Sequence, residues 1–103
     1  MNEAQAAARF AALSDPARLA ILRVLVRRGP EGLAAGAIAE ALGASPSRAS
    51  FHLAALSEAG LVTSRRAGRS IIYAAAFDGL GALVAWLVEE CCDGAEDLRA
   101  CCR

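Results

Sequence analysis

Two helix-start signals of the same kind, a capping residue followed by proline, divide the chain into short segments. Asp15-Pro16 and Ser45-Pro46 each place a capping side chain directly before a proline, which is favoured at the first position of a helix. Glycines follow as stop signals. The chain is therefore expected to form several short helices rather than one long helix. The predicted helices cover residues 3–13, 16–28, 34–42 and 46–58.

A β-hairpin and a last helix are predicted to follow. Residues 63–73 contain β-branched side chains and Tyr73, which favour strands, and Gly68 supplies the positive φ of a tight turn. A last helix is predicted from Gly79 to Cys92, where apolar residues recur at helical spacing. That stripe consists of Leu80, Leu83, Val84, Leu87 and Val88. This order predicts a mostly α fold with a β-hairpin wing: a winged helix-turn-helix with an extra helix at each end.

The apolar residues predict one domain with a modest core. In the second helix, Leu19, Leu22 and Val26 share one face, with Ile21 and Leu25 alongside. The 103 residues are 56% hydrophobic, but much of this is alanine, which buries little area. Because a small alanine-rich domain gains stability from a partner, we expect a homodimer.

Charge is distributed unevenly along the chain. Its formal net charge is +0, which alone argues against a nucleic-acid partner. Residues 1–75, however, hold nine arginines against five acids, whereas residues 76–103 hold two arginines against six acids. All 11 basic residues are arginine. Arginine makes planar, bidentate contacts with phosphate and guanine, but a GC-rich genome biases composition the same way, and both explanations stay open.

Membrane, secreted and enzyme classes are not expected. The chain has no run of about 18 apolar residues and no basic-then-apolar signal peptide. We therefore expect a cytoplasmic protein with reduced thiols, although four cysteines would also fit two disulfides in a secreted domain. The sequence contains no Cys/His dyad, paired carboxylate pocket or glycine phosphate loop.

The second short helix of the predicted helix-turn-helix carries candidate DNA contacts. Residues near the start of such a helix touch base edges in the major groove. Arg48 suits guanine, and serines suit several bases or a phosphate. His52 is expected to touch DNA or to make a local hydrogen bond, rather than to bind a metal. The candidates on this helix are Ser47, Arg48, Ser50 and His52.

The hairpin adds a second group of candidate contacts. Arg65, Arg66 and Arg69 surround its turn, where guanidinium groups suit a phosphate backbone or a minor groove. Taken alone, three arginines fit an ordinary solvated hairpin. Directly after a helix-turn-helix, they predict contact with operator double-stranded DNA.

All four cysteines lie in the last thirteen residues, as two adjacent pairs. They are Cys91, Cys92, Cys101 and Cys102. Thiolates are soft ligands that select soft ions, so the cluster predicts a site for a soft metal or metalloid. Residues 1–92 are accordingly predicted to form the DNA-binding and dimerisation domain, and residues 93–103 an inducer-binding tail.

The chain resembles the ArsR/SmtB repressors over about residues 8–92. The resemblance rests on three motifs: DPxRxxIL at 15–22, SRASFHLAAL at 47–56 followed by AGLV at 59–62, and GRxxxY at 68–73. It implies a homodimer built on the first and last helices, and a repressor that leaves its operator when an inducer binds. The interface residues on those helices are then Phe10, Leu80, Leu83, Val84 and Leu87.

The family's inducer sites can be compared with this chain. Residues 35–40 lack the Cys-x-Cys pair of one site, and the last helix lacks the histidine of another. The tail resembles a subgroup in which a Cys-Cys pair plus a later cysteine binds trivalent arsenic. The inducer implied is trivalent arsenic or antimony, held by Cys91, Cys92 and either Cys101 or Cys102.

Other functions remain open for the same cysteines. They would suit a redox or persulfide switch on a DNA-binding protein, although the surrounding acids raise thiol pKa. Four thiolates would also suit a cadmium, lead or zinc sensor. A thiol-rich metal-buffering protein would use the cysteines too, but it leaves the arginines of the hairpin unexplained.

Overall fold

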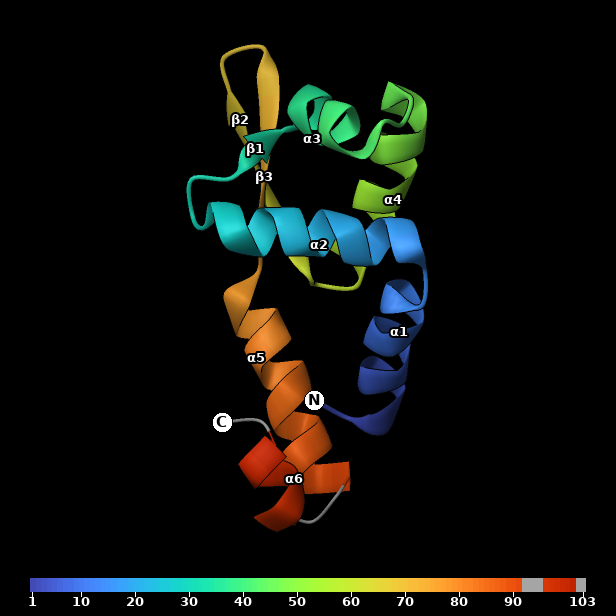
Figure 1. Ribbon diagram of the computed structural model, residues 1–103, viewed down its shortest axis with the longest axis vertical. Coiled ribbons are helices and arrows are strands. Elements are labelled where there is room, and N and C mark those ends of the chain that lie inside the picture. Colours follow the sequence, from blue (N-terminus) through green and yellow to red (C-terminus); the bar gives the residue numbers. More distant parts are fainter. Residues whose placement is uncertain (92–95, 102–103) are drawn as a thin grey trace.

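The structure, a computed structural model, describes residues 1–91 and 96–101, without the side chains of residues 91, 98, 99 and 101. Its elements follow one another in the predicted order (Figure 1). The helices are α1 (Glu3–Leu13), α2 (Pro16–Arg28), α3 (Ala35–Leu42), α4 (Pro46–Glu58), α5 (Phe77–Ala85), a π-helix (Trp86–Cys91) and α6 (Glu96–Cys101). The strands are β1 (Leu33–Ala34), β2 (Val62–Ala67) and β3 (Ser70–Ala75).

Side-chain caps fix where the helices begin. Asp15 Oδ1 accepts hydrogen bonds from the backbone N–H of Ala17 at 2.8 Å and of Arg18 at 3.4 Å. Ser45 Oγ accepts from the backbone N–H of Arg48 at 3.2 Å. Each bond satisfies a donor that has no partner within its own helix. Both cap-plus-proline predictions are therefore confirmed.

The predicted hairpin exists, but it belongs to a three-stranded sheet. β2 and β3 are antiparallel, and β1 adds to the other side of β3, giving the order β1-β3-β2. The sequence pattern does not predict β1, because two residues are too few to show an alternation of apolar and polar side chains. Gly68, with a φ of 63°, makes the hairpin turn as expected.

The last helix differs from its prediction at both ends. It begins at Phe77 instead of Gly79, and its final turns, Trp86–Cys91, are a π-helix. The predicted end at Cys92 lies outside the described residues. A π-helix has i→i+5 hydrogen bonds and places its side chains in a different register from an α-helix. The regular apolar stripe therefore breaks between Leu83 and Leu87.

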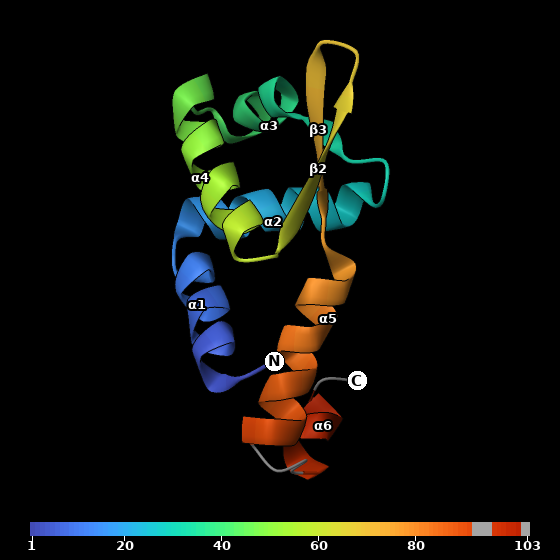
Figure 2. The same cartoon turned by 180° about the vertical axis from the view of Figure 1, so that it is seen from behind.

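The core lies where α2, α3, α4 and the base of the sheet meet. Its largest fully buried side chains are Ile21, Leu25, Ile38, Leu53, Leu56 and Leu61. α1 and α5 leave this body on the side opposite the wing (Figures 1 and 2). The molecule measures 46 × 24 × 23 Å, and its radius of gyration is 14.6 Å. A compact domain of this length has about 13 Å, so the two outer helices extend beyond the body.

Candidate nucleic-acid interface

The turn between α3 and α4 has a defined geometry. Gly43 is in the left-handed region with a φ of 64°, and its N–H bonds to the carbonyl of Glu40 at 3.1 Å. The N–H of Ala44 bonds to the carbonyl of Ala39 at 3.0 Å. Ser45 then caps α4. Because these bonds satisfy the end of α3 and the start of α4, they hold the two helices in a helix-turn-helix.

α4 presents one face to the core and the other to solvent. Ala49 is 1% exposed, and Leu53 and Leu56 are fully buried. The residues on the outer face are exposed: Ser47, Arg48, Ser50 and Phe51. The first three are among the four DNA contacts predicted on this helix, and the structure leaves them accessible to a major groove.

His52 does not share this exposure. Its side chain is only 7% exposed, and its Nδ1 accepts a hydrogen bond from Arg18 Nε at 3.1 Å. The predicted alternative, that His52 makes a hydrogen bond, is confirmed, but its partner is on another helix and is not local in the sequence. Burial of the ring does not support a direct base contact by His52, which instead ties α4 to α2. The sequence motif does not identify this bond, because its partners lie 34 residues apart.

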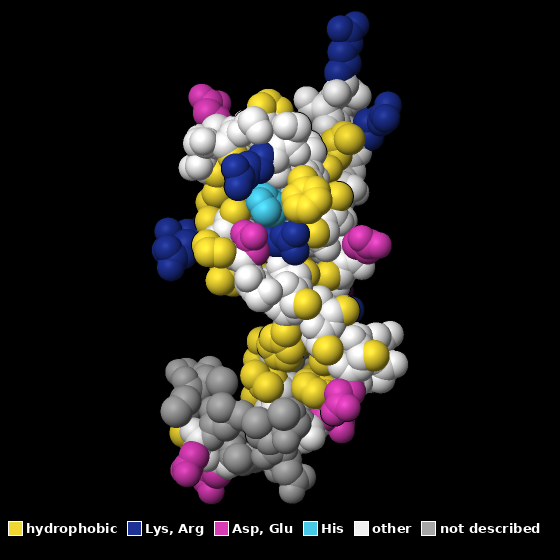
Figure 3. Space-filling view, turned by 90° about the vertical axis from the view of Figure 1, so that its right-hand side faces the viewer, with side chains coloured by type: hydrophobic (Ala, Val, Ile, Leu, Met, Phe, Trp, Pro, Cys, Tyr) yellow, Lys and Arg dark blue, Asp and Glu magenta, His cyan; other side chains and the backbone are white. Residues whose placement is uncertain are grey.

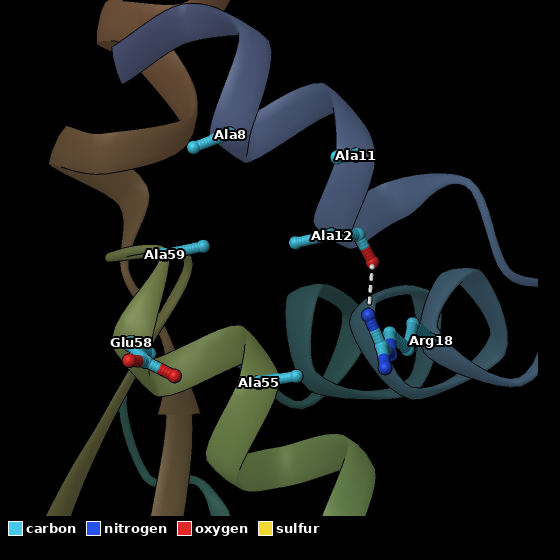
Figure 4. A pocket seen from close by; sticks show the side chains of 7 residues that line it. All are labelled: Ala8, Ala11, Ala12, Arg18, Ala55, Glu58 and Ala59. Carbon is cyan, nitrogen blue, oxygen red and sulfur yellow. Dashed lines mark hydrogen bonds between the residues drawn. The ribbon is translucent and has the colours of Figure 1, made fainter. Parts of the chain in front are cut away.

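Arg18 joins three elements at this point. Besides the bond to His52, its Nη1 donates to the carbonyl of Ala12 at 3.5 Å (Figure 4). Its guanidinium carbon lies 5.7 Å from the centroid of the Phe51 ring, which is within the range of a cation–π interaction. Arg18 therefore connects the end of α1, the start of α2 and the outer face of α4.

Asp15 lies beside this group and has an altered pKa. Desolvation by its surroundings acts to raise the pKa of the Asp15 carboxyl. Backbone hydrogen bonds from Ala17 and Arg18, together with electrostatic interactions with His52 and Arg18, outweigh that effect and lower the pKa below its ordinary value of 3.8. Asp15 therefore stays ionised and keeps its capping role at neutral pH.

The three wing arginines have different surroundings. All three are exposed, but Arg65 Nη2 donates to the carbonyl of Glu31 at 3.0 Å. Arg65 thereby joins β2 to the loop that precedes β1. Arg66 and Arg69 lie on either side of the Gly68 turn, close to the wing tip.

The outer side of α4 and the wing tip are visible from the same direction (Figure 3). Basic side chains mark the projecting tip, and the histidine, cyan in the figure, lies in the middle of the body with basic, hydrophobic and acidic side chains around it. The two predicted groups of DNA contacts are therefore presented on one face of the chain.

The residues predicted at a dimer interface differ in their exposure. The exposed fractions of Phe10, Val84 and Leu87 are 40%, 55% and 36%. Exposure of large apolar side chains in the single chain is what a dimer interface on these helices requires. Leu80 is half-buried. Leu83 is only 4% exposed and packs in the core of the single chain, so little of it is available to a second protomer.

α1 and α4 also border an open groove. Its cavity volume is about 390 Å³, and its walls are mostly alanine, with Arg18 and Glu58 at its margins (Figure 4). The alanines are Ala8, Ala11 and Ala12 of α1, and Ala55 and Ala59 at the end of α4.

A close backbone contact connects α5 to the end of α4. Arg9 Nη1 donates to the carbonyl of Gly79 at 2.9 Å, and its guanidinium also lies against Gly60. A Cβ at Gly79 would collide with the carbonyl oxygen of Gly60. Glycine is therefore required where α5 passes the turn after α4. No sequence motif singles out this contact.

The cysteine prediction falls largely outside what the structure describes. Cys92 and Cys102 are outside the described residues, and of Cys91 and Cys101 only the backbone is described. Within the described part of the chain, no three His, Cys, Asp or Glu side chains are grouped so as to hold a metal ion. Nor does any helix in that part have the length and apolarity needed to cross a membrane.

Comparison of the sequence with known proteins identifies relatives of this chain. A model of a helix-turn-helix domain family matches residues 13–65. The HTH-type transcriptional regulator YgaV of Escherichia coli (strain K12) is 38% identical over 88 residues, which cover 85% of this chain and 87% of that protein.

Solved structures show the same fold. An ArsR-like transcriptional regulator from Rhodococcus sp. RHA1 superposes with a TM-score of 0.77 and 35% identity, over 94% of this chain and 89% of that one. A homodimeric winged helix-turn-helix DNA-binding domain from Mycobacterium bovis, a possible ArsR-family regulator, gives a TM-score of 0.68 and 37% identity, over 89% of this chain and 85% of that one. The predicted winged helix-turn-helix fold is thereby confirmed.

Proposed function

Because the chain belongs to the ArsR/SmtB family of DNA-binding transcriptional regulators, we propose that it is a homodimeric, cytoplasmic repressor released from its operator by trivalent arsenic or antimony. The inducer would be bound by C-terminal cysteine thiolates. The observation that carries this proposal is the position of the cysteines: the pair Cys91-Cys92 begins at the last residue of the π-helix that continues α5, and the pair Cys101-Cys102 lies ten positions further along the sequence.

The homodimer is supported by the exposed apolar residues of the outer helices. Phe10 on α1 and Val84 on α5 are 40% and 55% exposed in the single chain. Burial of apolar area stabilises association by about 25 cal/mol per Å². A dimer of α1 and α5 would also place two copies of α4 symmetrically, as a two-fold operator requires.

The inducer is supported by ligand chemistry. Trivalent arsenic and antimony are soft and bind three sulfur ligands, and four thiols lie within thirteen residues. Successive side chains of an α-helix point about 100° apart, so Cys91 and Cys92 need an irregular backbone to reach one ion. The described helix is already irregular up to Cys91, where the π-helix ends. π-Segments are frequent at functional sites.

The experiment is a titration of a protein–DNA complex. Operator duplexes are selected from a random library and labelled, and fluorescence anisotropy is followed against arsenite, antimonite, cadmium, zinc and peroxide. Arsenite or antimonite should release the DNA at the lowest concentrations. Release by peroxide alone would favour the alternative of a redox or persulfide switch, and release by cadmium or zinc alone a soft-metal sensor.

Cysteine variants test the ligands one at a time. Cys91→Ser and Cys92→Ser should each abolish release by arsenite while DNA affinity without arsenite stays unchanged. Cys101→Ser and Cys102→Ser form the matched pair, because only the true third ligand should behave like Cys91. If both Cys91→Ser and Cys92→Ser still respond to arsenite, the cysteine assignment is wrong.

A further inference from the structure

We propose that Phe51 is a base-reading residue that contacts the C5-methyl group of a thymine in the major groove. The sequence motifs do not assign this role, which falls to Arg48 and the serines in the predicted interface. The proposal rests on the DNA binding within the proposed function, but not on the nature of the inducer.

Exposure and position provide the first support. The Phe51 side chain is 65% exposed, more than any other large apolar side chain among the described residues. It lies one helical turn after Ser47 and next to Ser50, on the outer face of α4. A residue there faces the major groove when a helix-turn-helix docks with the start of its second helix toward the bases.

The ring is also held in place. The Arg18 guanidinium lies 5.7 Å from its centroid, and the His52 ring meets it edge-on, with centroids 5.5 Å apart. His52 is itself fixed by the hydrogen bond from Arg18. These contacts reduce the freedom that Phe51 would lose on binding, which favours recognition by a preorganised group.

Chemistry then selects the ligand. The exposed edges of bases in the major groove offer hydrogen-bond donors and acceptors, and the thymine C5-methyl is the apolar group among them. A phenyl ring cannot form the strong hydrogen bonds that read the other edges, but it can exclude water from a methyl.

The test removes the methyl group without changing base pairing. Each thymine of a selected operator duplex is replaced in turn by uracil, and the Kd of the full-length protein is measured by anisotropy. At the position read by Phe51, loss of one methyl should weaken binding about fourfold per half-site. The same replacement should leave the Kd of Phe51→Ala unchanged, because the contact is already absent.

Two controls separate recognition from folding. Leu19→Ala removes another exposed apolar side chain, 51% exposed but on α2, and should keep the full sensitivity to uracil. Phe51→Leu keeps an apolar side chain, so it should keep part of that sensitivity even if Phe51→Ala binds too weakly to measure. Thermal melts establish that each variant is folded.

The outcomes distinguish this proposal from the proposed function. If no replacement of thymine by uracil changes the Kd, the role of Phe51 is overturned while DNA binding stands. The same follows if the replacement still weakens binding by a folded Phe51→Ala variant. A selected operator without thymine in either half-site overturns it as well. Failure to select any duplex would instead contradict DNA binding, and with it both proposals.

Discussion

The contact between α5 and the turn after α4 makes Gly79 a sensitive position for a single substitution. Gly79→Ala adds a methyl group that collides with the carbonyl oxygen of Gly60. Backbone cannot rotate away as a side chain can, so α5 must shift. Overpacking of this kind costs about 1–3 kcal/mol. The shift also strains the hydrogen bond from Arg9 to the Gly79 carbonyl, which adds about 1 kcal/mol.

Helix propensity acts in the opposite direction. Alanine is favoured over glycine inside a helix by up to about 1 kcal/mol. The net expected destabilisation of Gly79→Ala is then about 2 kcal/mol. For a domain of this size, that lowers the Tm by about 8–16 °C.

Gly81→Ala is the matched control, because it makes the same change two residues further along α5. No atom lies within 4 Å of a Cβ at Gly81. Only the gain in helix propensity remains, so the Tm should rise by about 4–8 °C. Gly36→Ala in α3, where a Cβ also meets nothing within 4 Å, gives a second control away from the predicted dimer interface.

The assay is thermal unfolding followed by circular dichroism, at one fixed protein concentration because dimer stability depends on it. The reasoning is refuted if Gly79→Ala melts at the same temperature as Gly81→Ala or above it. That result would mean that α5 accommodates the methyl without a shift, and that its contact with Gly60 is not tight in solution.

Three further predictions concern DNA and pH. Arg69→Ala should reduce the slope of log K against log salt by about 0.9 if the side chain neutralises one phosphate. Arg65→Ala should in addition remove the hydrogen bond to the Glu31 carbonyl, loosen that loop and lower the Tm. Footprinting should show half-sites about 34–36 Å apart or a multiple of this; protection of one half-site contradicts the dimer. Because the folded pKa of Asp15 lies below its ordinary value of 3.8, its stabilisation is present above that value and is lost as pH falls through the folded pKa. Asp15→Asn keeps a capping oxygen but does not titrate, so its Tm should fall less steeply than the wild type's between pH 4 and more acidic buffers.

Local signals predicted the elements well, because caps and turns act within a few residues. Asp15 and Ser45 cap the helices that they were expected to begin, and Gly68 turns the hairpin. Each of these features depends on hydrogen bonds or backbone angles of adjacent residues. A single sequence is sufficient to identify them.

The buried face of α2 shows where local signals fail. Leu19 and Val26, predicted to share one apolar face with Leu22, are 51% and 43% exposed, whereas Ile21 and Leu25, predicted alongside that face, are fully buried. The helix has apolar residues around most of its circumference. The face that enters the core is therefore decided by how α3, α4 and the sheet pack, and periodicity along α2 alone does not contain that information.

The candidate interface divides in the same way. Ser47, Arg48 and Ser50 could be identified because their positions follow from the start of α4. The hydrogen bond between Arg18 and His52, which ties α4 to α2, could not be identified from the sequence, because the two residues are 34 positions apart. The hydrogen bond of Arg65 to Glu31 likewise spans 34 residues and depends on the unpredicted strand β1.

The proposed function requires that a change near the cysteines reaches α4, and the fold limits how this can occur. α5 meets the rest of the fold near its start, where Gly79 packs against Gly60 and Arg9 Nη1 donates to the Gly79 carbonyl, and again at Leu83, which packs in the core. The first cysteine, Cys91, is the last residue of the π-helix at the other end, and the remaining three come later in the sequence. A helix transmits a rotation along its axis only as far as its hydrogen bonds keep their register, and a change between π and α register rotates everything beyond it by about 100°. A signal from the cysteines can therefore reach Gly79 either as a displacement of the whole helix or as a change of register within the π-helix. Because there is no space for even a methyl group between Gly79 and the Gly60 carbonyl, a displacement of α5 toward Gly60 must move the turn after α4 with it.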